Sequence, residues 1–256
     1  MRKSRLAVFA TTVIIAIGLV CASFLYGNSS TSPKQQISAF VSQIQEYIFT
    51  KVENGLADDD TASDDYRTVN DNVPQFTGDD LTTISYESYG QLDYLGRCTA
   101  AMACLSEDTM PKDGETRGDI SAVTPSGWKQ STYEILKTQQ NESGFLYNRC
   151  HLIAWCLGGE NDNALNLITG TRHLNETMWY FESQVQTYIY ETGNHVMYRV
   201  TPVYSGDNPV ADGVQMEAYS VEDNGYLQFN VFCYNNQSGI NIDYSTGASR
   251  LDAAES

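Results

Sequence analysis

Basic residues are scarce in this chain of 256 residues, which has 15 lysines and arginines against 32 aspartates and glutamates and a formal net charge of −17. This balance argues against a protein that binds a polyanion through a broad cationic surface, because a field of this sign repels one. Recognition of a polyanion would then depend on a local cationic cleft and on bound metal ions. The alternative interpretation of the acidity is that it serves solubility alone.

Histidine is also scarce, with three copies, and no Cys-x2-Cys knuckle is present. Cys150 and Cys156 flank His151, but their spacing does not match that of a zinc knuckle, which disfavours a zinc site there. A cysteine nucleophile is disfavoured too, because neighbours such as Cys150 and His151 point apart in a strand. Five cysteines follow the leader, so at least one thiol stays unpaired outside the cell.

One long uncharged run stands at the beginning of the chain, from Leu6 to Tyr26, after the basic residues Arg2, Lys3 and Arg5. Residues 1–26 are therefore predicted to be a signal peptide or an uncleaved signal anchor. The protein is then secreted, or it is anchored on the outer face of the cell membrane through this segment.

Residues 27–80 read as a linker that carries one amphipathic helix and an acidic loop. Within 37–52, apolar residues recur at helical spacing, and this apolar face could pack on the following domain or on a partner. The acidic loop, 58–65, has five aspartates but lacks the spacing and the terminal glutamate of an EF-hand. We interpret it as a solvated linker. No protein partner can be named from these patterns.

Residues 81–248 are predicted to form one domain of class α+β, with a mixed, mainly antiparallel sheet. Short strands are expected at 82–86, 91–94 and 98–105, and a helix at 131–137. Three alternating stretches, 195–204, 214–221 and 226–234, predict three strands of one sheet. Residues 249–256 are predicted to be a C-terminal tail.

The most unusual short stretch runs from Tyr147 to Leu152 and contains Arg149 and His151. In an extended strand successive side chains point to opposite faces, so these two side chains, two residues apart, point to the same face. A base beside a fixed cation suits a site that holds a phosphate and activates a water. A lone histidine is more often a core or surface residue, so the pair carries this hypothesis.

A short, mostly apolar strand is predicted at 165–169, and helical spacing begins at Leu174. Asn175 and Glu182 lie close to two helical turns apart, since two turns take about 7.2 residues. They therefore share a line at the edge of the apolar stripe. An amide oxygen and a carboxylate there, both half-buried, suit a hard cation such as Mg²⁺. The alternative is that Asn175 is a helix N-cap and Glu182 a solvated residue.

The segment Asn148-Arg149-Cys150-His151 resembles the Asp-Arg-Gly-His motif of the DNA/RNA non-specific endonucleases, the ββα-metal or His-Me finger nucleases. The resemblance covers roughly residues 94–244 and is strongest to secreted and surface DNases of Gram-positive bacteria. Two positions depart from the motif. Asn148 replaces an aspartate that could orient its neighbours, and Cys150 replaces a glycine or serine and places a larger, oxidisable side chain beside the base.

The resemblance implies a ββα-metal finger core and an extracytoplasmic endonuclease that hydrolyses phosphodiester bonds without sequence preference. DNA is the expected substrate, with RNA left open. His151 would be the general base, Arg149 a catalytic and phosphate-binding cation, and Arg172 a second substrate-binding cation. Asn175 falls where the family carries its metal-ligand asparagine and would hold one Mg²⁺, with Mn²⁺ as a possible substitute. Glu182 would hold a metal-bound water and count as catalytic.

Two functions of other classes remain as alternatives. The first is a surface protein that binds or takes up nucleic acid with little or no cleavage, which Asn148, Cys150 and the acidity favour. The second is a purely structural exported domain, in which Arg149, His151, Asn175 and Glu182 would coincide by chance. Digestion of a plasmid with and without EDTA separates cleavage from both alternatives.

Overall fold

The structure is a computed structural model and describes residues 65–253. The predicted leader, the predicted helix within 37–52 and all but the last residue of the acidic loop lie outside the described residues. Within 65–253, no helix combines the length and the apolar character that a membrane crossing requires.

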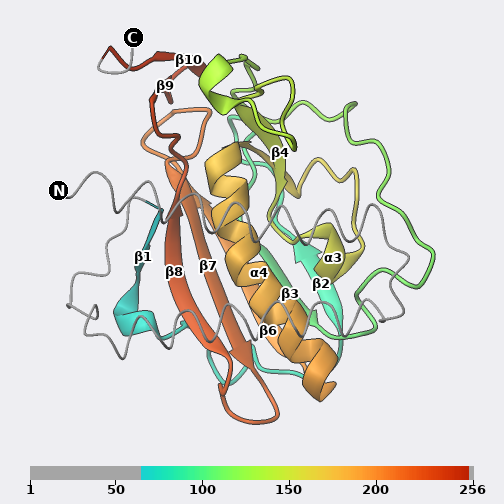
Figure 1. The fold of residues 1–256 in the computed structure, drawn as a ribbon. Helices are drawn as coiled ribbons and strands as arrows, with labels where there is room; N and C mark the ends of the chain where they lie inside the picture. Colours follow the sequence, from blue (N-terminus) through green and yellow to red (C-terminus); the bar gives the residue numbers. More distant parts are fainter. Residues whose placement is uncertain (1–64, 254–256) are drawn as a thin grey trace, which may run out of the picture. The chain divides into compact units, whose positions relative to one another are not determined.

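A six-stranded sheet forms the centre of the described fold (Figure 1), and all of its strand pairs are antiparallel. In spatial order the strands are β1 (Tyr66–Thr68), β8 (Gln228–Tyr234), β7 (Gly213–Ser220), β6 (Val196–Val203), β3 (Ala101–Leu105) and β2 (Tyr86–Tyr89). The three predicted strands near the end of the chain are confirmed as β6, β7 and β8. The predicted α+β class, with its mainly antiparallel sheet, is confirmed as well.

The two strands predicted at 82–86 and 91–94 are not formed as predicted, because local side chains bind the backbone instead. Thr82 Oγ1 accepts a hydrogen bond from the backbone N–H of Ile84, and Asp93 Oδ1 accepts from the N–H groups of Leu95 and Arg97. Such contacts compete with strand pairing. A strand forms four residues later, as β2, and the predicted strand at 98–105 is shortened to β3.

The helix predicted at 131–137 is reduced to the single 3-10 turn η2 (Glu134–Leu136). On each side of η2 a residue forms an isolated β-bridge, Thr132 with Phe145 and Thr138 with Asn141. A segment whose two ends pair as strands has no length left for a regular helix.

A second layer is built from the hairpin of β4 (Tyr147–His151) and β5 (Leu167–Thr171), with the short helix α3 (Trp155–Gly158) in its connection, and from α4 (Arg172–Thr192). α4 follows β5 directly, so β4, β5 and α4 form the predicted ββα unit. Thr171 caps α4, since its Oγ1 accepts from Leu174 N–H, and Gly193 ends it in the left-handed region. The buried face of α4 packs on the central sheet to make the main core (Figure 1).

The described fold extends beyond the predicted limits of the domain at both ends. β1 and the 3-10 turn η1 (Asn70–Asn72) precede residue 81, and β1 pairs with β8. β10 (Ala248–Leu251) pairs with β9 (Ile240–Asp243) and includes the first residues of the predicted tail. A three-residue edge strand is too short to show alternation, which is why the sequence did not indicate β1.

Candidate active site

The register of the hairpin sets the direction of every side chain on β4. Arg149 pairs with Thr169 and His151 with Leu167, so both side chains lie on one face. Cys150 lies on the other face, where a Cβ added at Gly170 would stand 2.4 Å from its Sγ. Gly170 thus leaves the space that the Cys150 thiol fills. Cys150 and His151 point apart, as predicted for neighbours in a strand, so the Cys150 side chain lies in the core and not beside His151.

His151 is buried, with 7% of its surface exposed, and both of its ring nitrogens have partners. Nε2 lies 2.8 Å from the backbone oxygen of Asn161, and Nδ1 lies 3.0 Å from Arg117 Nη2. A carbonyl can only accept, so Nε2 carries the proton and Nδ1 keeps the lone pair. Burial first, and then the Arg117 cation, lower the pKa of His151 to about 4, while the hydrogen bond to Asn161 opposes them. The ring is therefore neutral at physiological pH.

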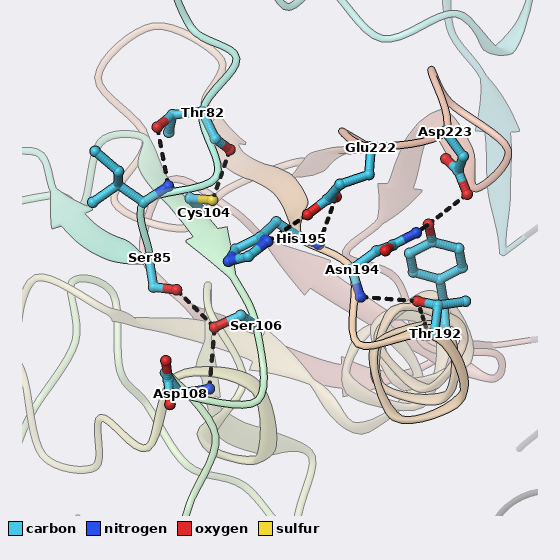
Figure 2. A network of polar contacts seen from close by, with 12 residues as sticks. Thr82, Ser85, Cys104, Ser106, Asp108, Thr192, Asn194, His195, Glu222 and Asp223 are labelled. Atoms are coloured by element: carbon cyan, nitrogen blue, oxygen red, sulfur yellow. Dashed lines mark hydrogen bonds and ion pairs between the residues drawn. The ribbon is translucent and has the colours of Figure 1, made fainter.

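The other two histidines have carboxylate partners. His173 Nε2 lies 2.9 Å from Asp65, and His195 Nδ1 lies 2.6 Å from Glu222. Figure 2 shows His195 and Glu222 within a polar network whose labelled residues all lie outside β4 and β5. His151 is thus the histidine that faces a guanidinium, and it is the one suited to remain a neutral base.

Arg149 is occupied by the backbone of a neighbouring segment. Its Nε donates to the carbonyl of Val123, its Nη2 donates to the carbonyl of Ser121 at 3.0 Å, and its guanidinium lies 4.3 Å from the ring centroid of Trp128. No hydrogen bond joins Arg149 to His151 in the part of the chain that the structure describes. The predicted shared face is correct, but the cation in contact with His151 is Arg117 and not Arg149.

Arg117 and Asn161 are the two site residues that the sequence did not indicate. Arg117 lies in an exposed stretch of the long connection between β3 and β4, and the next residue, Gly118, lies against Asn161. A Cβ added at Gly118 would stand 2.7 Å from Asn161 Nδ2. The sequence feature that could have pointed to Arg117 is the Arg-Gly pair in a polar loop, and such a loop shows no hydrophobic periodicity.

Asn175 and Glu182 both lie on α4, but their environments differ. Asn175 is exposed and makes no side-chain hydrogen bond within 65–253, whereas Glu182 is only 6% exposed. The prediction that both are half-buried is wrong, because later turns of α4 are covered by α3, as Gln186 Nε2 donating to Cys156 O shows. The N-cap alternative for Asn175 is also wrong, since Thr171 caps the helix.

Glu182 is held largely as the neutral acid. Burial raises the pKa of its carboxyl group to about 8, and the nearby Arg117 cation acts in the opposite direction. The solvated alternative for Glu182 is therefore wrong. Burial also raises the pKa of the Cys150 and Cys156 thiols, so both stay protonated.

The candidate metal-binding side chains on α4, Asn175 and Glu182, offer oxygen donors. Among the described residues, no three side chains of His, Cys, Asp or Glu gather as a metal cage. The exposed amide oxygen of Asn175 is a hard donor, and Mg²⁺ commonly keeps several waters and takes one or two protein oxygens. Glu182 lies two turns further along α4 and is buried.

The buried acid predicts a distinctive pH dependence of stability. Between pH 4.5, its ordinary pKa, and about 8, folded Glu182 keeps a proton that the unfolded chain has lost. Stability therefore falls as pH rises through this window. In EDTA, the Tm of Glu182→Gln relative to wild type should increase by at least about 2 °C between pH 5 and pH 8. Differential scanning calorimetry measures it, and the exposed Glu176→Gln is the matched control. An equal pH response in both variants would contradict the burial of an ionisable group at 182.

Comparison with known proteins shows that the chain is similar to nucleases. The family described as DNA/RNA non-specific endonuclease matches residues 77–222. NucA from Streptococcus agalactiae with magnesium bound is 27% identical, with a TM-score of 0.63 over 75% of this chain and 88% of that one. Its metal-free form is 26% identical, with a TM-score of 0.62 over 75% and 89%. Sda1 nuclease with bound zinc is 24% identical, with a TM-score of 0.61 over 73% and 96%, and this likeness concerns the fold alone.

Proposed function

The chain belongs to the DNA/RNA non-specific endonuclease family and is a phosphodiester hydrolase that acts on nucleic acid, and from this premise we propose that His151 is its general base and one Mg²⁺ its metal. Mn²⁺ would substitute. The observation that carries the proposal is the state of the His151 ring. Asn161 holds the proton at Nε2, so Nδ1 carries the lone pair that a base needs.

The chemical step follows from this tautomer. Nδ1 of His151 takes a proton from a water, the resulting hydroxide attacks phosphorus, and the 3′ oxygen leaves opposite to it. The neutral state of His151 supports this role, because a ring that is already protonated could not accept a proton. The imidazolium that forms keeps its Nε2–H bond to the Asn161 carbonyl, so the ring does not turn during the step.

Asn175 would hold the cation through its exposed amide oxygen, and Glu182 would hold a water of that cation. When bound, the cation polarises the phosphate and stabilises the leaving oxyanion. Arg172 lies 3.0 Å from Glu176 and would contact substrate on the same side of α4. Contacts confined to phosphate and metal carry no base information, which supports cleavage without sequence preference.

Arg149 contributes by positioning the segment 121–128 rather than by holding a phosphate directly. Its Nε and Nη2 donate to two carbonyls of this segment, and its guanidinium lies over the Trp128 ring. Residues 121–128 follow Arg117 and Gly118 closely in the chain. By binding this segment, Arg149 helps to position Arg117, whose guanidinium contacts His151.

Arg149→Lys is expected to lower kcat by about 10–100-fold with little change in KM, because lysine cannot reproduce a planar, two-carbonyl contact with ring stacking. Limited proteolysis should become faster within 117–128. Arg250→Lys is the control, since it also keeps the charge and Arg250 is an exposed residue of β10 outside the candidate site. A direct phosphate role for Arg149 would show instead as a raised KM with unchanged proteolysis.

Residues 1–26 support secretion or anchoring on the outer face of the cell membrane, with the membrane contacted only if the segment is retained. DNA is the proposed substrate, with RNA as an additional one. The alternative is a surface protein that binds nucleic acid with little cleavage, which the net charge of −17 favours.

Digestion of a supercoiled plasmid and of a structured RNA, in EDTA and with Mg²⁺, Mn²⁺ or Zn²⁺ added, tests the proposal. We expect cleavage with Mg²⁺ and Mn²⁺ and none in EDTA. Shifted but uncut plasmid in every metal would support the binding protein instead.

A further inference from the structure

The lone pair that the proposed base must use is already occupied. Arg117 Nη2 donates to His151 Nδ1 at 3.0 Å, and the other nitrogen is bound to the Asn161 carbonyl. A water cannot donate to the same lone pair while the guanidinium remains there. The arrangement in this structure therefore blocks proton abstraction, although it also brings a cation to the reacting centre.

Arg117 is held there by little else. It lies in an exposed loop, and within 65–253 no carboxylate forms an ion pair with it, whereas Arg97, Arg172 and Arg199 each have one. Glu182 is a buried carboxyl group that feels the Arg117 charge, but the two form no ion pair. Arg117 therefore contributes a positive charge without an ion-pair partner in a strongly acidic protein.

The surroundings of the contact also indicate that it is easily broken. Next to it, the Oδ1 atom of Asn161 is buried without a hydrogen-bond partner. A buried acceptor left unpaired destabilises the arrangement that contains it. Arg149 differs, because two carbonyls and an aromatic ring hold its guanidinium. Of the two arginines, Arg117 is the one that can change partners.

We propose that the scissile phosphate draws Arg117 away from His151, so that the substrate itself uncovers the general base. A guanidinium binds an anionic phosphate oxygen by charge-assisted, often bidentate hydrogen bonds, which are stronger than its contact with a neutral ring nitrogen. One residue then has two positions, a cap on the base in the free protein and a phosphate contact in the complex. This inference rests on the proposed function of His151.

The experiment observes the ring nitrogens of His151 directly. Protein with ¹⁵N-labelled histidine is studied by NMR in EDTA, where the bound nucleic acid is not cut. His173→Gln and His195→Gln assign the three rings. The ligand is a short single-stranded phosphodiester oligonucleotide, and its control has the same sequence with uncharged methylphosphonate linkages. Fluorescence anisotropy confirms saturation by each.

The phosphodiester oligonucleotide should move the His151 Nδ1 resonance towards that of a nitrogen without a hydrogen bond. The methylphosphonate oligonucleotide should leave it unchanged. Arg117→Met should show the moved resonance before any ligand is added, and Arg250→Met, which removes the same charge from an exposed position on β10, should behave as wild type.

Three results would overturn the inference. The first is a His151 resonance that is the same in Arg117→Met and in wild type, and the second is one that stays still while the phosphodiester oligonucleotide is bound. The third is absence of binding at any concentration. Failure of the proposed function has a different signature, since plasmid would then stay uncut with Mg²⁺ even if the resonance moves.

Discussion

His151→Ala should lose nearly all cleavage, by about 10²–10⁴-fold in single-turnover rate, while its fold and its metal affinity stay unchanged. The reason is geometric. His151 is the histidine whose partners leave a neutral ring with a lone pair on the side facing Arg117, and the carbonyl of Asn161 fixes that tautomer. Nothing else within the described residues combines a neutral base with that cation. The measurement is nicking of a supercoiled plasmid in excess enzyme with Mg²⁺.

His195→Ala is the matched control for His151→Ala. His195 pairs with Glu222 in the network of Figure 2, so its loss should leave the chemical step near wild type. Circular dichroism and thermal unfolding establish that both variants fold. If His151→Ala kept more than about a third of the wild-type rate, the general-base role would be excluded, because that loss is far below what a missing base causes.

Asn175→Ala should abolish metal-dependent cleavage and weaken binding of Mg²⁺ to the protein. Its amide oxygen is exposed on the first turns of α4 and has no side-chain partner within 65–253, so it is available to a cation. A magnesium ion that keeps most of its waters depends on few protein oxygens, and removal of its direct ligand leaves little to hold it. Calorimetric titration with Mg²⁺ and with Mn²⁺ measures the loss separately from activity.

Glu176→Gln is the informative control for Asn175→Ala. Glu176 is the exposed carboxylate next to Asn175, and it lies 3.0 Å from Arg172. As a carboxylate it offers the oxygen ligands that a hard cation takes. Unchanged metal affinity in Asn175→Ala together with a lost affinity in Glu176→Gln would reassign the ligand. If both variants bound Mg²⁺ with the wild-type affinity, the metal would be held by other residues.

Several features of the fold follow from local sequence. The alternation in 195–204, 214–221 and 226–234 predicted β6, β7 and β8, since one buried face imposes a period of two. The change to helical spacing near Leu174 predicted α4, and the short apolar run at 165–169 predicted β5. The ββα unit was readable because its three elements follow one another closely in sequence and each shows its own period. His151 and Asn175 were singled out for the same reason, as motif residues on those elements.

The partners of these residues depended on contacts between distant segments. Arg117 stands 34 residues before His151, in a loop without periodicity, so nothing local indicates that its guanidinium reaches the ring. Arg149 was expected to hold phosphate because it shares a face with His151. Only the packing of residues 121–128 against β4 shows that backbone carbonyls and Trp128 occupy it.

Glu182 marks the same division on a single helix. Helical spacing correctly places Asn175 and Glu182 on one line, but it contains no information on what covers that line along its length. Asn175 lies in solvent at the beginning of α4, whereas Glu182 is buried two turns further, where α3 packs on later turns of the helix. The sequence by itself determined the ββα unit, the histidine and the helical line. Only the tertiary structure decided which cation contacts His151 and which carboxyl group is buried, because both depend on how loops and α3 pack over that unit.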